Sequence, residues 1–166
     1  MRARNIMVGL AVAAFTTLGI GASASATPKV PDALQVPAGN KLILLSPARG
    51  VQTYQCTGDA LTFVQPDAIL THRGQLEILH TKGPVWTSVA DGSSVTGAVV
   101  ASSPVPNAIP QLLLRSVGNR GPGKLADVTV IQRLKTTGGL APTGPCTEGA
   151  TASVPYTADY AFYVAQ

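Results

Sequence analysis

The segment PYTADYAFYV, residues 155–164, decides the fold class of this chain. Successive side chains of a β-strand point to opposite faces, so a strand with one buried face alternates with a period of two. One face of this segment would carry Tyr156, Ala158, Tyr160, Phe162 and Val164, and the other Thr157, Asp159 and Ala161. The first face is aromatic and apolar, and the second is mostly polar. We therefore expect a half-buried strand here.

Similar short runs fill the chain from residue 41 onwards, separated by turn-forming groups such as Asp91-Gly92 and Gly121-Pro122-Gly123. After residue 26, no window sustains the spacing of a long amphipathic helix. The pattern predicts an all-β fold, an antiparallel β-sandwich or barrel of about 8–9 short strands. Residues Leu42–Leu45 are apolar on both faces, which predicts a strand covered on both sides. The predicted strands are 41–46, 51–57, 61–64, 75–80, 85–89, 94–101, 111–117, 126–134 and 155–164.

The first 26 residues have the pattern of a secretory signal peptide. Arg2 and Arg4 form a basic start, residues 6–21 are apolar and uncharged, and Ala24-Ser25-Ala26 is typical of a cleavage site. We expect the segment 1–26 to be removed and the protein to be secreted into the extracellular space. An uncleaved segment that anchors the chain is the alternative. No later apolar run approaches the roughly 20 residues of a membrane helix, so we expect no integral membrane segment after cleavage.

The remaining 140 residues would carry 10 basic and 8 acidic side chains, and 27 of them are Gly or Pro. This composition excludes a helical bundle, a coiled coil and a polybasic nucleic-acid binder, and we expect no nucleic-acid partner. Their number fits one domain. We expect an extended, Pro-rich lead-in over residues 27–40 and a single β domain over residues 41–166.

Cys56 and Cys146 are the only cysteines. In an exported protein such a pair predicts a structural disulfide. It would close a loop of roughly 90 residues and stabilise the fold by about 4–5 kcal/mol in the chain-entropy model. A redox-active or metal-binding pair is the alternative, but the sequence offers neither CxxC spacing nor a nearby His to complete a zinc site.

Most catalytic templates are missing from the sequence after residue 26. It contains no G-x-S-x-G, no P-loop and no GxGxxG, so we expect no cofactor and favour a protein that is not an enzyme. A Ser-His-Asp site built on His72 or His80 stays open, and so does a pair of carboxylates. The two histidines could also share a metal, although we predict no metal site and no catalytic residue.

The densest group of informative residues is the segment from His80 to Trp86, followed by Asp91-Gly92-Ser93. Two interpretations are open. His80 and Trp86 could be core residues, or they could line a pocket with the indole as a stacking platform and the imidazole as hydrogen-bond partner or base. Tyr54, next to the disulfide, is likewise either a strand residue of the core or part of a site. The predicted ligand-binding residues are His80, Trp86, Asp91 and Tyr54.

Several short motifs occur in the order typical of one family. They are Val36-Pro37-Ala38-Gly39, Leu44-Leu45-Ser46-Pro47, Gly50-Val51-Gln52, Tyr54-Gln55-Cys56, His80-x-x-Gly83-Pro84-x-Trp86, Asp91-Gly92-Ser93, Ile109-Pro110, Ile131-Gln132-Arg133, Thr137-Gly138-Gly139 and Tyr156-x-Ala158-x-Tyr160. Together they resemble a family of small secreted bacterial and fungal proteins known as a domain of unknown function (number thirty-four fifty-five). The resemblance spans nearly all of the chain after residue 26. It implies an exported single domain and no particular activity.

Three hypotheses about function follow. The first is a non-catalytic β module that binds an extracellular or cell-envelope ligand, such as a glycan, through the His80–Trp86 region. The second is an extracellular hydrolase whose site lies around His80, with Asp91 or another carboxylate as partner. The third is a structural or stress-related surface protein. The sequence identifies neither the ligand nor the oligomeric state.

Overall fold

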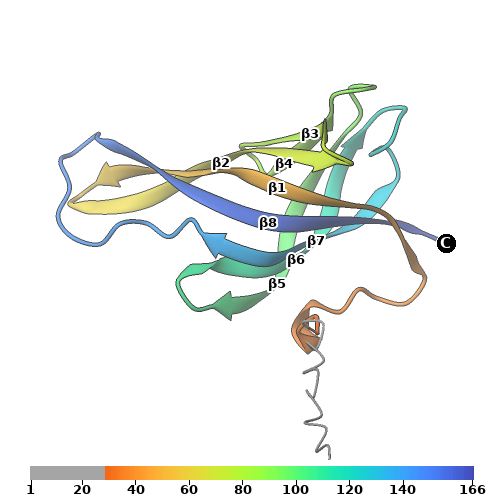
Figure 1. Cartoon of the computed structure of the whole chain (residues 1–166), viewed down its shortest axis with the longest axis horizontal. Helices are drawn as coiled ribbons and strands as arrows, with labels where there is room; N and C mark the ends of the chain where they lie inside the picture. The colour runs from red at the N-terminus through yellow and green to blue at the C-terminus, as the bar shows by residue number, and fades with distance from the viewer. Residues whose placement is uncertain (1–28) are drawn as a thin grey trace, which may run out of the picture.

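The computed structural model describes residues 29–166, so the predicted signal peptide lies outside the described residues. Eight antiparallel strands pair in sequential order, and β8 pairs back with β1 to close a barrel (Figure 1). The all-β prediction is confirmed, and the chain adopts the barrel form. The elements are η1 (Asp32–Leu34), β1 (Asn40–Thr57), β2 (Ala60–His72), β3 (Gln75–Thr81), β4 (Val85–Ser88), β5 (Ser94–Val105), β6 (Ala108–Arg120), β7 (Val128–Gly138) and β8 (Thr151–Ala165).

The first two predicted strands, 41–46 and 51–57, are in fact one continuous strand, β1. The prediction left residues 47–50 outside both strands, and that was wrong. A Cβ atom at Gly50 would lie 2.2 Å from the carbonyl oxygen of Asp67 and 2.4 Å from the Cβ of Ala68. Glycine inside a strand often marks a close backbone approach. Gly50 therefore allows β1 to approach β2 closely, rather than ending the strand.

The β3–β4 hairpin is much shorter than its neighbours, and this opens one side of the barrel wall. β3 pairs with β2 only over residues 68–72, and β4 pairs with β5 only over residues 94–96. Beyond this hairpin, the β1–β2 and β5–β6 hairpins both extend to the left in Figure 1. Among the described strands, residues 60–67 of β2 pair only with β1, and residues 97–105 of β5 pair only with β6. This part of the wall, unpaired on the side of the short hairpin, is called the side opening below.

The lead-in packs against the outer face of the barrel. Leu34 of η1 is fully buried against Leu113 of β6 and Val130 of β7. The amide Nε2 of Gln132 also donates a hydrogen bond of 2.6 Å to the carbonyl oxygen of Leu34. Because Ile131 belongs to the inner core, β7 is covered on both faces.

The predicted two-sided burial of Leu42–Leu45 is wrong. Leu44 is buried in the inner core, but Leu42, Ile43 and Leu45 are 40–48% exposed. The pairing of β1 with β8 shifts register between Leu42 and Leu44, and the lead-in covers β5–β7 instead of this part of β1. The apolar run of Leu42–Leu45 therefore did not identify the strand that is covered on both faces, which is β7.

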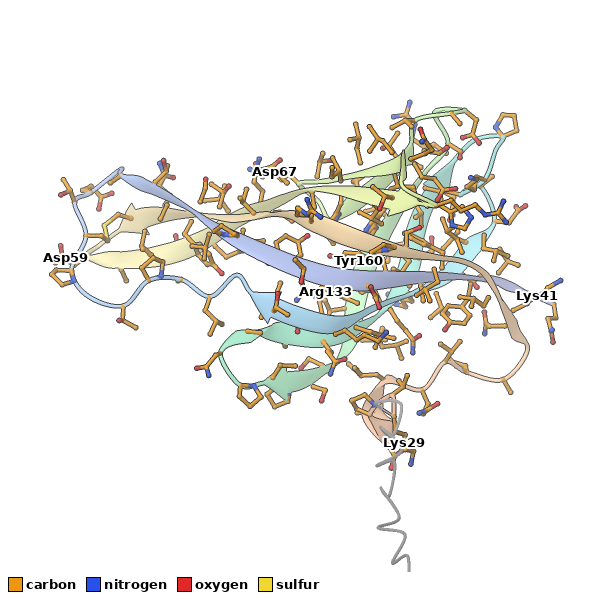
Figure 2. All side chains as sticks on the ribbon, viewed as in Figure 1. Lys29, Lys41, Asp59, Asp67, Arg133 and Tyr160 are labelled. Carbon is orange, nitrogen blue, oxygen red and sulfur yellow. A yellow bond between two sulfur atoms is a disulfide. The ribbon has the colours of Figure 1, made fainter. Side chains whose placement is uncertain are left out.

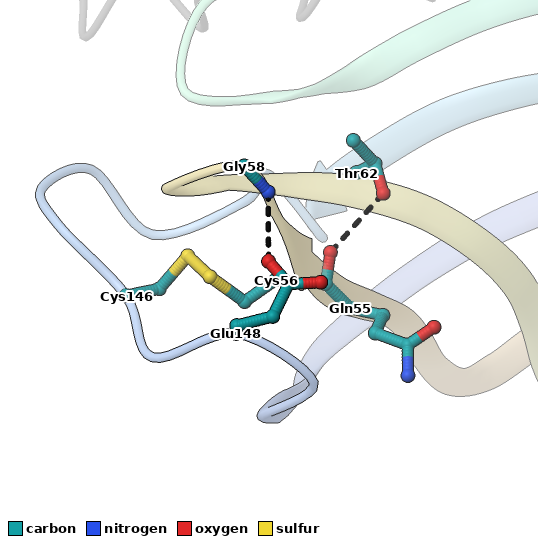
Figure 3. Close-up of a disulfide and its surroundings, with 6 residues drawn as sticks. All are labelled: Gln55, Cys56, Gly58, Thr62, Cys146 and Glu148. Carbon is teal, nitrogen blue, oxygen red and sulfur yellow. Dashed lines mark hydrogen bonds between the residues drawn. A yellow bond between two sulfur atoms is a disulfide. The ribbon is translucent and has the colours of Figure 1, made fainter.

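The disulfide between Cys56 and Cys146 is present, as predicted, and joins Cα atoms 5.9 Å apart (Figure 3). Cys56 lies near the end of β1, and Cys146 lies in the long loop between β7 and β8. A carboxylate oxygen of Glu148 also accepts a hydrogen bond of 2.8 Å from the backbone N–H of Gly58. The bridge thus fastens that loop to the tip of the β1–β2 hairpin. Within residues 29–166, no helix has the length and hydropathy needed to cross a membrane.

Candidate ligand-binding cavity

His80 and Trp86 form an aromatic stack on the inner face of the barrel. They are cross-strand partners on β3 and β4, so both side chains point to the same face. Their rings lie parallel within 2°, with centroids 4.3 Å apart. Tyr160 of β8 packs edge-on against both, at 5.3 Å and 5.5 Å. His80 is 2% exposed and Trp86 is 1% exposed, so both rings belong to the packed interior.

The same two residues border a partly open cavity of about 220 Å³. Phe63 of β2 and Val99 of β5 line it and are each 55% exposed, so the cavity meets solvent there. His80 and Trp86 therefore pack in the interior and also border a cavity, while their role in binding a ligand stays a prediction. The lining consists of Phe63, Val64, Pro66, His80, Gly83, Pro84, Trp86, Val99, Leu112, Leu114, Arg133 and Tyr160.

Arg133 is the one charged side chain of this lining. It stands opposite Tyr160 on β8 and Leu112 on β6, so the three side chains form one row across neighbouring strands. Figure 2 shows Arg133 and Tyr160 near the middle of the barrel. Arg133 donates from Nε and Nη2 to the carbonyl oxygen of Pro110, at 3.1 Å and 2.9 Å. These two bonds hold the guanidinium in place.

Within residues 29–166, Arg133 forms no ion pair with an acidic side chain. The ion pairs found within residues 29–166 join Lys29 to Asp32, Lys124 to Glu77 and Lys135 to Asp159. A charged group in apolar surroundings is costly unless an opposite charge or hydrogen bonds compensate it. The cavity therefore combines an apolar wall with one positive charge, which is hydrogen-bonded to Pro110 but has no ion-pair partner in the described part of the chain.

His80 is neutral in this setting. Burial lowers its pKa from 6.5 to about 4, and the hydrogen bond to the backbone of Val85 opposes that shift. Nδ1 lies 3.0 Å from the carbonyl oxygen of Val85. A neutral imidazole can make that bond only with a hydrogen on Nδ1, which leaves Nε2 as an acceptor. His80 thus adds an aromatic surface and an acceptor to the lining, without a charge.

Tyr54 lies outside the cavity lining. Its ring packs edge-on against Phe63 at a centroid distance of 5.8 Å. Its hydroxyl donates a hydrogen bond of 2.5 Å to the carbonyl oxygen of Gly139, where the long β7–β8 loop begins. Burial raises the pKa of this phenol, and the positive charge of Arg133 lowers it. Tyr54 therefore supports Phe63 and the start of the loop.

Asp91 lies in a loop cluster that includes none of the cavity-lining residues. One carboxylate oxygen accepts hydrogen bonds from the backbone N–H and the hydroxyl of Ser93, at 2.9 Å and 2.6 Å. The other accepts one of 2.9 Å from the backbone N–H of Lys124. These bonds hold the pKa of Asp91 well below its usual range. Asp91 therefore fastens the loop after β4 to the loop before β7.

The His80–Asp91 pair of the hydrolase hypothesis is not joined by a hydrogen bond in the described part of the chain. His80 is bonded to Val85, while Asp91 is bonded to Ser93 and Lys124. Residues 29–166 also contain no group of three or more His, Cys, Asp or Glu side chains that could hold a metal ion.

Sequence reasoning missed Arg133, Tyr160 and Leu112 as members of the site. Arg133 did give a signal, since it is a charge inside an apolar strand. The face of the sheet to which the Arg133 side chain points could not be predicted, because the pairing of β7 with β8 shifts register between Val128 and Val130. Such a shift breaks the alternation that assigns side chains to a face.

Comparison with known protein families matches residues 74–164 to the family described as "Protein of unknown function (DUF3455)". The chain belongs to this family. The resemblance drawn from the sequence motifs is thereby confirmed. The matched part begins just before β3 and reaches almost to the end of β8, so it includes His80, Trp86, Arg133 and Tyr160. Neither the curated proteins nor the solved structures gave a significant match.

Proposed function

We propose that this protein is an exported binding protein that holds a small, mainly apolar ligand in its barrel. The observation that carries this proposal is the cavity of about 220 Å³ with its largely apolar and aromatic lining. Binding pockets typically combine such a lining with a few polar groups that orient the ligand. An apolar cavity of about 150 Å³ accommodates benzene, so this cavity suits a molecule of one ring with short substituents.

The surroundings of Trp86 favour an apolar ligand over a glycan. A glycan would need an exposed aromatic face and several polar partners, but Trp86 is 1% exposed and already stacked on His80. Binding without catalysis is supported by the bonds of His80 and Asp91, which occupy these two groups separately. In this proposal, the polar groups of the lining, which belong to His80, Arg133 and Tyr160, orient the ligand.

Ligand-observed NMR with benzoate, cyclohexanecarboxylate and benzyl alcohol tests cavity binding. Leu112→Trp places a large ring in the cavity, and Ile43→Trp adds the same ring at an outer position that is 40% exposed. We expect saturation transfer to at least one probe with the wild type and Ile43→Trp, and its loss with folded Leu112→Trp. No transfer to any probe with the wild type, or full binding by Leu112→Trp, would contradict the proposal.

Export is supported by the signal-peptide pattern of residues 1–26 and by the presence of a disulfide, which persists in oxidising compartments. The full chain, expressed in a bacterial host, should appear outside the cytoplasm with Thr27 as its first residue. Ala26→Asp should block cleavage, since small residues are needed at that position. Mass spectrometry of the cell and culture fractions distinguishes the two forms. A wild-type chain that stays in the cytoplasm with residues 1–26 attached would refute export.

A further inference from the structure

We infer that the cavity selects a small apolar monocarboxylate, whose carboxylate is bound by Arg133 through two parallel hydrogen bonds. This inference rests on the proposed binding function and names the class of its ligand. It depends on three properties of the cavity, which are the free donors of Arg133, the single charge of the lining and the size of the apolar part.

The guanidinium of Arg133 keeps donors available for a ligand. A guanidinium has five N–H donors. Two of them, on Nε and Nη2, are used on the carbonyl oxygen of Pro110. The guanidinium also lies close enough to the hydroxyl of Tyr160 to lower its pKa. Three N–H donors, two on Nη1 and one on Nη2, are not used on Pro110, and the edge formed by Nη1 and Nη2 presents the two parallel donors that a carboxylate accepts from arginine.

The charge of the lining fits one negative charge. Arg133 has no acidic partner among the ion pairs of residues 29–166, and the cavity has no second cationic side chain. His80 is neutral above its lowered pKa of about 4, and burial keeps the phenol of Tyr160 protonated. A monoanion would compensate Arg133, whereas a phosphate dianion would bring an excess negative charge into apolar surroundings.

The rest of the lining fits an apolar body. Phe63, Val99, Leu112 and Leu114 contribute aliphatic or aromatic carbon, and the buried rings of Trp86 and His80 border the cavity from the packed interior. A volume of about 220 Å³ exceeds the roughly 150 Å³ that accommodates benzene, and it is below the usual range of drug-sized pockets. The geometry therefore matches a carboxylate on a body of about one six-membered ring, such as benzoate or cyclohexanecarboxylate.

Arg133 is itself well placed to receive a ligand from solvent. It is half-buried, and its row on the inner wall includes Leu112, which also borders the cavity. The side opening is bordered by Phe63 and Val99, which are both more than half exposed.

Affinities of the wild type for benzoate, benzamide and benzyl alcohol at pH 7 test the inference without any variant. The three probes share the ring and differ in charge. We expect benzoate to bind at least about tenfold more tightly than either neutral probe, because charge-assisted hydrogen bonds are roughly twice as strong as neutral ones. Equal affinities for the three probes would overturn the carboxylate assignment and leave cavity binding intact. Binding of none of them would overturn the proposed function itself.

Two substitutions sharpen the test. Arg133→Met removes the charge and the donors but keeps an apolar chain, and Arg133→Lys keeps the charge without the fork of donors. We expect Arg133→Met to weaken the binding of benzoate by about tenfold or more and the binding of benzyl alcohol by less than about threefold. Arg133→Lys should bind benzoate with an affinity between those of the wild type and Arg133→Met. Unchanged benzoate affinity in a folded Arg133→Met protein would overturn the inference. Displacement of benzoate by an equal concentration of inorganic phosphate would do the same, since it would indicate a general anion site.

Discussion

At the scale of single residues, Gly50 occupies a place where no side chain fits. A Cβ atom there would overlap the backbone of Asp67 and the side chain of Ala68. We expect Gly50→Ala to lower the free energy of unfolding by about 1–3 kcal/mol, because overpacked sites force the backbone to shift. Urea unfolding followed by the fluorescence of Trp86, the single tryptophan, measures this.

Gly118→Ala is the matched control for Gly50→Ala. Gly118 also lies in a strand, β6, but a Cβ atom there would meet nothing within 4 Å. Alanine also reduces the conformational freedom of the unfolded chain. We expect a change near zero or a slight gain in stability. Equal losses in the two variants would show that close approach of β1 and β2 is not the cause.

The buried imidazole of His80 makes stability depend on pH. Its folded-state pKa of about 4 lies below the ordinary 6.5, so the unfolded chain binds the proton more readily. The stability that neutral His80 contributes is fully present above pH 6.5. As the pH falls towards 4, the free energy of unfolding decreases by up to about 3 kcal/mol. We expect His80→Gln to flatten this part of the pH profile in urea unfolding, while exposed His72→Gln leaves it unchanged. A parallel acid loss in His80→Gln and the wild type would exclude His80 as the source.

The sequence could predict His80 and Trp86 as neighbours at the site, but not the residues that surround them. His80 and Trp86 are close in the chain and joined by a Gly-Pro turn, so local pattern was enough to place them on adjacent strands. Arg133 and Tyr160 reach the same cavity from β7 and β8, through pairing that is distant in sequence. Asp91 was grouped with His80 because it follows closely in the chain, yet its hydrogen bonds hold it to Lys124, 33 residues away.

At the scale of elements, a bulge in β3 turns an acidic side chain into the barrel. Leu70 pairs with Ile78 and Thr71 with Leu76, which leaves Glu77 without a partner residue. Its carboxylate is only 10% exposed and pairs with Lys124 from the β6–β7 loop, whose side chain is 39% exposed. The ion pair therefore helps to fasten that loop across the end of the barrel.

Because the two partners differ in burial, their removal should have unequal effects. Lys124→Met leaves a buried carboxylate without its ion-pair partner, whereas Glu77→Gln leaves an ammonium that can reach solvent. We expect Lys124→Met to lower the free energy of unfolding by about 1–3 kcal/mol, and Glu77→Gln by less. Lys135→Met is the control, since Lys135 is 60% exposed and surface pairs contribute about 0–1 kcal/mol. Denaturant unfolding at neutral pH gives the three values, and a larger loss in Lys135→Met would contradict this account.

The disulfide should act mainly on the β7–β8 loop. β1 already pairs with β8 from Asn40 to Gln55, so the barrel is closed without the bridge. We expect the Cys56→Ser/Cys146→Ser protein to keep its β-sheet signal in circular dichroism, and to lose about 2–4 kcal/mol of stability. Limited proteolysis with mass spectrometry should show faster cleavage between residues 139 and 150. Unchanged cleavage there would show that other contacts hold the loop.

Strand positions were predictable where alternation is regular, and less so where the sheet bends. The last strand was predicted from its period of two, and its aromatic face is buried as expected from Tyr156 to Phe162. β1 was predicted as two strands on either side of residues 47–50, which include a proline and a glycine, although Gly50 here permits a close contact. Local propensity cannot distinguish these two uses of glycine, since the neighbouring strand decides between them.

At the scale of the whole molecule, the barrel has two separate apolar cores. The inner core surrounds the aromatic stack, and the outer one lies between the lead-in and β5–β8, around Leu34. Composition and turn spacing predicted the fold class, because many local signals along the chain all indicate short strands separated by turns. Closure of the barrel and the cover over β7 depend on contacts between distant segments, and no local pattern encodes those.

The separation of the two cores leads to a prediction for Leu34→Ala. This fully buried side chain stabilises the outer face, and its truncation should cost about 2–4 kcal/mol in urea unfolding. Leu42→Ala, at a position 47% exposed, is the control and should cost far less. Below its melting temperature, Leu34→Ala should bind the cavity probes like the wild type, because Leu34 contacts the opposite face of the wall from the cavity lining. Weakened probe binding in the folded variant would instead mean that the outer cover shapes the cavity.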